Sequence, residues 1–281
     1  MNKNVLLVND MPGYGKVALG AMIPILSAMG HYVHNLPTCL VSNTLDYGKF
    51  EIMDTTEYIR RSIRVWKALG FTFDCLCTGF LLTLEQADII REYVKENRSK
   101  DFLVISDPIM GDDGKLYNGV DSGRIGIMQK LIEIADIVIP NVTEAGFLTG
   151  FHPGATTVAE SDIRTLVDGV RQLGPKSVVI TSVCVKETGK NLVAGYDART
   201  KEYFLLPYDE IPVHFPGTGD IFSAVMAGKL LNGYPLSESV RMAMNAVRFL
   251  IGKSQYNRDK FRGLLLEKFV MHIDEISQMN D

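Results

Sequence analysis

The chain is poor in the features that mark extracellular, membrane and nucleic-acid-binding proteins. Its 281 residues include 4 cysteines, which fall inside apolar stretches without the spacing of a zinc site. No apolar run approaches the roughly 18 residues needed to cross a bilayer. The 29 Lys+Arg and 33 Asp+Glu give a net charge of -4, so the basic patches that nucleic acid or an anionic membrane requires are missing. We therefore expect a soluble, cytoplasmic protein with reduced thiols that binds neither nucleic acid nor membranes.

Short β-branched runs alternate with segments of helical periodicity, which is the pattern of a parallel sheet covered by helices. The strand-like runs are residues 5–8, 102–105, 136–139 and 177–180. The helical segments are residues 15–29, 55–69, 84–96, 124–134, 162–173, 220–231, 236–251 and 259–277. Residues 192–196 and 203–206 are further strand-like runs joined by a polar turn, and they predict an antiparallel hairpin late in the sheet. Because no internal repeat or long linker occurs, the sequence favours one domain over residues 1–281.

Polar residues follow the predicted strands at the points where the strands end. Ligands of doubly wound sheets bind outside the carboxyl ends of the strands, so these residues converge on one edge and predict a shared site. The alternative is that each one only caps a turn or a helix. The residues concerned are Asn9 and Asp10, Ser106 and Asp107, Pro140, Asn141 and Glu144, and Thr181 and Ser182.

The sharpest motif is Gly217-Thr218-Gly219-Asp220, which is followed by small and apolar residues of helical period. Two glycines let backbone N–H groups face one concavity, and the helix behind them adds the positive end of its dipole. Such a cradle holds a phosphoryl group, while an adjacent acid takes the proton of the attacking hydroxyl. The motif therefore indicates phosphoryl transfer. The alternative is that Asp220 only stabilises the first turn of its helix.

A second acidic motif places Asp107 and Asp112 on a tight loop after a predicted strand. Hard oxygen ligands at this spacing suit Mg²⁺ that is held largely through water and nucleotide phosphates. Asn141 and Glu144 follow the next strand and add oxygens, and a cluster of acids without a cation would repel itself. These residues therefore predict a Mg-phosphate site, with turn capping as the alternative.

Together these motifs resemble the pyridoxal/pyridoxine kinases of the ribokinase superfamily, over nearly the whole chain. Further matching stretches are Tyr14-Gly15, Ser42-Asn43, Tyr47-Gly48 and Thr78-Gly79-Phe80-Leu81. The resemblance implies a ribokinase-like α/β fold, doubly wound, with a mostly parallel sheet flanked by helices, and it implies a homodimer. It also implies an ATP-dependent kinase that phosphorylates the 5'-hydroxymethyl group of pyridoxal, pyridoxine or pyridoxamine, in the salvage of vitamin B6 to pyridoxal 5'-phosphate.

The same resemblance assigns roles to individual residues. Asp220 would be the general base, and Gly217, Thr218 and Gly219 would form the anion hole. Asp107, Asp112 and Glu144 would arrange Mg²⁺, a monovalent cation such as K⁺, and the ATP phosphates. The other implied ATP contacts are Tyr117, Asn141, Thr181, Ser182 and Phe215. The implied contacts with the hydroxymethyl heterocycle are Asp10, Tyr14, Ser42, Asn43, Leu45, Tyr47 and Phe80.

The sequence departs from the family pattern on the vitamin side. Asp10 stands where the family usually has Ser, Thr44-Leu45 where it has His-Thr, and Phe80 where a Tyr is expected. A carboxylate at position 10 can pair with a protonated ring nitrogen or an amine more strongly than a Ser can, so we expect an altered preference among the three vitamers. Two alternatives remain. One is a hydroxymethylpyrimidine kinase of the same superfamily, and the other is a non-catalytic sensor that binds a B6 compound.

Overall fold

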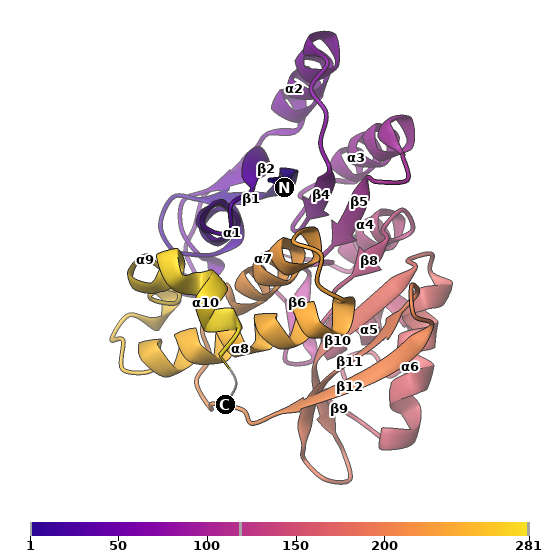
Figure 1. The fold of residues 1–281 in the computed structure, drawn as a ribbon, viewed down its shortest axis with the longest axis vertical. Coiled ribbons are helices and arrows are strands. Elements are labelled where there is room, and N and C mark those ends of the chain that lie inside the picture. Colours follow the sequence, from indigo (N-terminus) through magenta and orange to yellow (C-terminus); the bar gives the residue numbers. More distant parts are fainter. Residues whose placement is uncertain (1, 118–119, 280–281) are drawn as a thin grey trace. The chain divides into compact units, whose positions relative to one another are not determined.

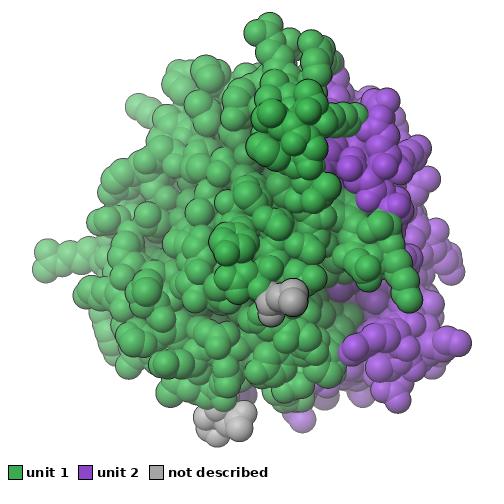
Figure 2. Space-filling view, turned by 45° about the horizontal axis from the view of Figure 1, so that its top comes forward, with its two compact units in different colours: residues 1–82, 99–103, 211–281 green, residues 83–98, 104–210 purple. Residues whose placement is uncertain are grey.

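The computed structural model describes residues 2–117 and 120–279. The chain divides into two compact units, which Figure 2 shows in green and purple. Unit 1 comprises Met1–Leu82, Ser99–Leu103 and Ile211–Asp281, and unit 2 comprises Thr83–Arg98 and Val104–Glu210. This division does not test the prediction of one domain over residues 1–281, which stays a prediction. None of the described helices combines the length and the hydropathy needed to span a membrane.

Unit 1 is built on a mainly parallel sheet. Its strands are β1 (Asn4–Pro12), β2 (Tyr32–Val41), β3 (Ile52–Asp54) and β4 (Cys75–Thr78). β1 is parallel to both β2 and β4, while β3 is antiparallel to β2. Residues 5–8 of β1 are fully buried, as expected for a central parallel strand. β1 runs beyond this apolar stretch, with a register shift between Asn9 and Met11, so the polar pair Asn9-Asp10 still belongs to the strand.

The long helices of unit 1 pack against this sheet and against one another. They are α1 (Ala18–Ala28), α2 (Thr56–Leu69), α7 (Thr218–Leu231) and α8 (Leu236–Ser254). α1 contacts β1 and β2, and α7 contacts both α1 and α8, as can be followed in Figure 1. Residues 220–229 of α7 are all buried. Because α7 is enclosed on all sides, polar side chains at both of its ends are withdrawn from water.

The prediction of one helix over residues 259–277 is wrong. The segment contains the short elements η3 (Lys260–Arg262), α9 (Leu266–Phe269), η4 (Val270–His272) and α10 (Ile273–Ser277). Gly263 has φ +95°, and it lies against the backbone of Lys16, whose N–H donates to the Arg262 carbonyl at 2.9 Å. A glycine with positive φ ends a helix. The contact with Lys16 therefore overrides the helical period of the sequence.

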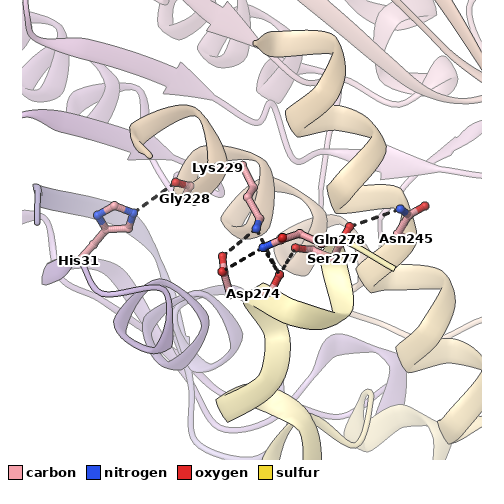
Figure 3. A network of polar contacts seen from close by, with 7 residues as sticks. All are labelled: His31, Gly228, Lys229, Asn245, Asp274, Ser277 and Gln278. Atoms are coloured by element: carbon pink, nitrogen blue, oxygen red, sulfur yellow. Dashed lines mark hydrogen bonds and ion pairs between the residues drawn. The ribbon is translucent and has the colours of Figure 1, made fainter. Parts of the chain in front are cut away.

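An ion pair between the buried Lys229 and the partly exposed Asp274 fastens α10 to α7 (Figure 3). The side chain of Lys229 is 0% exposed, and its Nζ donates to the Asp274 carboxylate at 2.7 Å. The same Nζ donates to the Asp274 carbonyl at 3.2 Å, which also accepts from the Ser277 hydroxyl at 2.7 Å. Asn245 of α8 donates to the Ser277 carbonyl at 3.3 Å. The C-terminal segment is thus tied to the helix that begins at the glycine motif.

The strands of unit 2 are also mainly parallel, with a late antiparallel hairpin. They are β5 (Leu103–Ser106, of which Leu103 is assigned to unit 1), β8 (Ile137–Val138), β9 (Thr157–Val158), β10 (Ser177–Val185), β11 (Asn191–Asp197) and β12 (Glu202–Tyr208). β5, β8 and β10 are parallel neighbours, while β11 and β12 add to β10 as the predicted hairpin. A separate small hairpin contains β6 (Gly111–Asp112) and β7 (Lys115–Leu116).

The helices of unit 2 alternate with its strands along the chain. They are α3 (Leu84–Asn97), α4 (Gly123–Ile132), α5 (Val142–Thr149), η2 (Glu160–Asp162) and α6 (Ile163–Gln172). α5 was missed in the sequence although Asn141 and Glu144 have the spacing of a capping box, which would have located its first turn. The strand-helix alternation and the late hairpin are confirmed by the structure.

Candidate active site

α7 begins at the glycine motif. Gly217 is its N-cap with φ +84°. A Cβ at this position would collide with the Lys16 carbonyl oxygen and crowd Val17. Thr218, Gly219 and Asp220 are the first three helical residues, and the N–H groups of a first helical turn have no partner within the helix. The local geometry is therefore that of an anion-binding helix start, and it requires glycine at position 217.

Asp220 is 8% exposed. Its Oδ1 accepts from Asn9 Nδ2 at 3.3 Å, and the carboxylate also accepts from the Ala18 N–H. Burial raises the pKa of Asp220 to about 6, although these two donors oppose the rise. The carboxylate is thus ionised at neutral pH, yet it is a better proton acceptor than an ordinary aspartate, as a general base requires.

Asp10 is a second acid in the same part of unit 1. Burial and the negative charge of Asp220 raise the pKa of Asp10 to about 7, while a backbone hydrogen bond opposes the shift. Its side chain keeps some contact with solvent. Near neutral pH this acid holds a proton for much of the time, and a cationic group of a ligand would replace that proton favourably.

The two predicted vitamin-side tyrosines meet over a carboxylate of the C-terminal segment. The rings of Tyr14 and Tyr47 pack edge to face with centroids 5.9 Å apart. Their hydroxyls donate to Asp259 at 3.4 Å and 2.7 Å. Phe261 packs on Tyr47 with centroids 5.5 Å apart. Tyr14, Tyr47 and Phe261 remain exposed, so the cluster presents aromatic surface that a flat heterocycle can contact.

Ser42 and Asn43 build the loop that leads to Tyr47. The Ser42 hydroxyl donates to Asn43 Oδ1 at 2.7 Å and accepts from the Glu51 N–H at 2.9 Å. Asn43 Nδ2 donates to the carbonyls of Thr44 at 3.0 Å and Lys49 at 2.9 Å. The hydrogen bonds of both side chains stay within their own loop. They shape the loop in this structure, and their predicted contact with substrate stays a prediction.

The loop is joined to the C-terminal segment by Thr44, whose hydroxyl donates to the Phe261 carbonyl at 2.8 Å. Leu45, which begins η1 (Leu45–Tyr47), is half-buried. Phe80 is 8% exposed, and its N–H donates to Asn9 Oδ1 at 2.8 Å. Phe80 therefore lies beside the residue that contacts Asp220.

In unit 2, Glu144 and Asn141 join the acidic loop to the start of α5. They form a capping box, in which Asn141 Oδ1 accepts from the Glu144 N–H and Glu144 Oε2 accepts from the Asn141 N–H, both at 2.9 Å. Glu144 Oε1 accepts from the N–H groups of Met110 at 3.0 Å and Gly111 at 3.4 Å. Asn141 Nδ2 donates to the Gly111 carbonyl at 2.7 Å. Both side chains therefore hold the loop against α5.

Glu144 is 3% exposed. Burial and the negative charge of Asp107 raise the pKa of Glu144 well above its ordinary value, although three backbone N–H groups oppose the rise. Two acids that repel each other in this way would be stabilised by a cation. Within residues 2–117 and 120–279, no three His, Cys, Asp or Glu side chains are grouped to hold a metal ion. The carboxylates of Glu144 and Asp107 would fit a Mg²⁺ ion that takes its other ligands from water and phosphate.

Thr181 and Ser182 lie at an irregularity of β10, where the register with β11 shifts between Ile180 and Val183. The Thr181 N–H donates to the Pro140 carbonyl at 3.0 Å, and Ser182 is exposed with φ +57°. Burial raises the pKa of Tyr208, with Glu210 and Asp112 adding to the rise, while Ser182 hydrogen-bonds to its hydroxyl. Asp112 and Ser182, which the sequence singled out, therefore both lie near Tyr208.

Tyr117 is 38% exposed, whereas Phe215 is 1% exposed and belongs to the core of unit 1. The predicted base, the predicted anion hole and the predicted vitamin-side residues all belong to unit 1. The predicted nucleotide residues other than Phe215 belong to unit 2. Asp259 was missed in the sequence, and Asn9 was predicted only as one of the polar residues that follow a strand. Each contacts a partner more than 200 residues away in the sequence.

Comparison with known proteins assigns the chain to a family. A family model described as phosphomethylpyrimidine kinase matches residues 21–262. The chain belongs to this family. One curated relative is the pyridoxine/pyridoxal/pyridoxamine kinase of Bordetella avium. It is 28% identical to this chain, and the match covers 84% of this chain and 80% of the relative.

Solved structures agree with this assignment. A candidate phosphomethylpyrimidine kinase from Bacteroides thetaiotaomicron, in a crystal form with pyridoxal, is 34% identical and has a TM-score of 0.93, covering 99% of this chain and 98% of its own. The pyridoxal kinase of Lactobacillus plantarum is 28% identical with a TM-score of 0.86, covering 98% of each chain. The predicted resemblance to B6 kinases and the predicted ribokinase-like fold are confirmed. The protein is a phosphotransferase that acts on an alcohol group.

Proposed function

We propose that the protein transfers the γ-phosphoryl group of ATP to the 5'-hydroxymethyl group of a B6 vitamer. The observation that carries the proposal is the buried Asp220, with a pKa of about 6, in the first turn of a helix whose start can hold a phosphoryl group. A 34% identical relative whose crystal form contains pyridoxal supports a B6 vitamer as the acceptor.

In the proposed reaction Asp220 takes the proton of the acceptor hydroxyl. The resulting alkoxide oxygen forms a bond to the γ-phosphorus, and the bond from that phosphorus to the β,γ-bridging oxygen breaks, so ADP leaves. The N–H groups of Gly217, Thr218 and Gly219, together with the dipole of α7, stabilise negative charge on the transferred group. Asp220 then gives its proton to solvent.

On the vitamin side, Asp10 would contact the ring hydroxyl, the ring nitrogen or the amine of the vitamer. Support comes from the raised pKa of Asp10, about 7, because a cationic partner stabilises the ionised form of an acid whose ionisation is disfavoured by burial. The remaining vitamin contacts are proposed for Tyr14, Ser42, Asn43, Leu45, Tyr47 and Phe80. We therefore keep the prediction of an altered preference among pyridoxal, pyridoxine and pyridoxamine.

MgATP is the proposed phosphoryl donor, with Asp107, Asp112 and Glu144 arranging Mg²⁺ and a monovalent cation such as K⁺. When bound, Mg²⁺ would neutralise charge on the ATP phosphates. The mutual repulsion of Glu144 and Asp107 supports a cation there. The remaining proposed ATP contacts are Tyr117, Asn141, Thr181, Ser182 and Phe215.

We further propose a homodimer that acts in vitamin B6 salvage in the cytoplasm. The exposed side chains of Leu40 on β2 and of Ile52 and Met53 on β3 support an interface at this end of the sheet of unit 1. Analytical ultracentrifugation tests the oligomeric state. A single monomeric species at micromolar concentration would contradict the dimer.

The first experiment measures ADP release with MgATP against pyridoxal, pyridoxine, pyridoxamine and hydroxymethylpyrimidine. Asp220→Asn should retain ATP binding and lose roughly 10²- to 10⁴-fold in kcat, as expected for the loss of a general base. Turnover of the pyrimidine alone would favour a hydroxymethylpyrimidine kinase. Binding of a vitamer without any turnover would favour a sensor, and an unchanged rate in the variant would exclude Asp220 as the base.

A further inference from the structure

The contacts of Asn9 give it a role that its position in the sequence does not reveal. Asn9 is 1% exposed. Its Oδ1 accepts from the Asp10 N–H at 3.0 Å and from the Phe80 N–H at 2.8 Å. If the Asn9 side-chain amide were rotated by half a turn, the N–H groups of Asp10 and Phe80 would both face its NH₂ group. These two donors therefore determine the orientation of the Asn9 amide. The Nδ2 end must therefore face Asp220, whose Oδ1 lies 3.3 Å away.

Packing leaves this amide little room to move. Asn9 Nδ2 lies 3.6 Å from the Met22 sulfur of α1. Gly79 directly follows the neighbouring parallel strand β4, and a Cβ at position 79 would collide with all three terminal atoms of the Asn9 side chain, so glycine is required there. The amide is thus held between β1, the residues after β4, and α1, and it presents one donor to α7.

We propose that Asn9 is a positioning residue, which orients the Asp220 carboxylate toward the acceptor hydroxyl and keeps it ionised. This inference rests on the proposed function, in which Asp220 is the base. Asn9 acts through Asp220 and does not touch the reacting atoms. Because the same side chain holds the backbone of Asp10 and Phe80, the base and two proposed vitamin contacts share one anchor.

Few other groups can set the protonation of Asp220. α1 has no titratable side chain, and β1 contributes only Asp10. The buried residues of α8 are all uncharged. The cation of α7, Lys229, lies at its other end and pairs with Asp274. Burial raises the pKa of Asp220, and the donors that oppose this are the Ala18 N–H and the Asn9 amide. Without Asn9 we therefore expect that pKa to rise further.

The test compares kcat–pH profiles of the wild type, Asn9→Leu and Asn9→Asp. Asn9→Asp keeps an oxygen for the N–H groups of Asp10 and Phe80 but loses the donor to Asp220. Both variants should shift the acidic limb upward by about one pH unit or more, which is roughly a tenfold lower kcat on that limb. The KM for ATP should stay within about twofold, since the proposed ATP contacts lie elsewhere.

The matched control is Thr38→Val, which removes the buried hydrogen bond from the Thr38 hydroxyl to the Phe80 carbonyl. It should lower stability without moving the acidic limb. If the Asn9 variants fold and their profiles superimpose on that of the wild type, the inference is overturned.

A second measurement needs neither activity nor an altered Asn9. In ¹⁵N spectra of the wild type, the Asn9 side-chain amide should titrate with a midpoint near the pKa of Asp220, and this titration should disappear in Asp220→Asn. If the chemical shift of the Asn9 side-chain amide does not change with pH, the inference is overturned, even if both Asn9 variants fail to fold. A protein without turnover but with this titration would refute the proposed function and retain the contact.

Discussion

Replacing Asp10 by serine should stabilise the protein at alkaline pH and not in acid. Burial and the charge of Asp220 raise the pKa of Asp10 from 3.8 to about 7 on folding, so the folded state holds the proton more tightly than the unfolded state does. Below pH 3.8 Asp10 is protonated in both states, so its ionisation does not affect the free energy of unfolding. As the pH rises from about 4 to about 7, ionisation increasingly favours the unfolded chain, and above pH 7 the full cost is present.

The magnitude follows from the shift. About three pKa units at about 1.4 kcal/mol each set an upper limit of about 4 kcal/mol. The Asp10 side chain keeps some solvent contact, and screening by that water reduces the figure. We therefore expect Asp10→Ser to gain about 2 kcal/mol in the free energy of unfolding at about pH 8, and close to zero at about pH 4.

The assay is urea unfolding of both proteins at these two pH values, followed by circular dichroism. The control is Asp46→Ser, because Asp46 is an exposed acid of η1 in the same unit. Its effect should be the same at both pH values. An Asp10→Ser gain that does not depend on pH, or a loss at alkaline pH, would refute the reasoning that the Asp10 carboxylate is destabilised by folding.

Two further predictions concern contacts of the C-terminal segment. Asp259→Ala removes the acceptor of the hydrogen bonds from the Tyr14 and Tyr47 hydroxyls. At about 1 kcal/mol for each hydrogen bond, the variant should raise the KM for the vitamer roughly 5- to 30-fold. The KM for ATP should stay constant. An equal rise in both values would contradict its role on the vitamin side. Asp274→Ala leaves the fully buried Lys229 ammonium without its carboxylate partner. It should lower the free energy of unfolding, measured with urea, by about 3 kcal/mol, and adding Lys229→Met should recover most of this loss. A loss below about 1 kcal/mol would show that the pair contributes little.

Local patterns of the sequence predicted most of the secondary structure. Residues 5–8 and 178–180 are apolar runs of β-branched and aliphatic residues, and they lie in β1 and β10. Such runs are dictated by burial on both faces of a parallel strand. The predicted helix over residues 259–277 failed because periodicity describes one segment at a time. The left-handed Gly263 and its contact with Lys16 end that helix, and neither is visible in the helical period.

The glycine motif is the part of the candidate site that the sequence described best. Gly217 and Asp220 are three residues apart, so the helix start alone determines their relation. The alternative that Asp220 only stabilises the first turn could not be decided locally. It depends on the Asn9 donor, which is 211 positions away, and on burial that raises the pKa of the acid to about 6.

By itself the sequence determined the alternation of strands and helices, the glycine-rich helix start at Gly217 and the polar residues that follow the apolar runs. Only the tertiary structure decided that Asn9 faces Asp220 and that Asp259 joins Tyr14 to Tyr47. The physical reason is range. Backbone propensities and side-chain period act over a few residues, whereas a hydrogen bond between distant segments exists only once the core has brought those segments together.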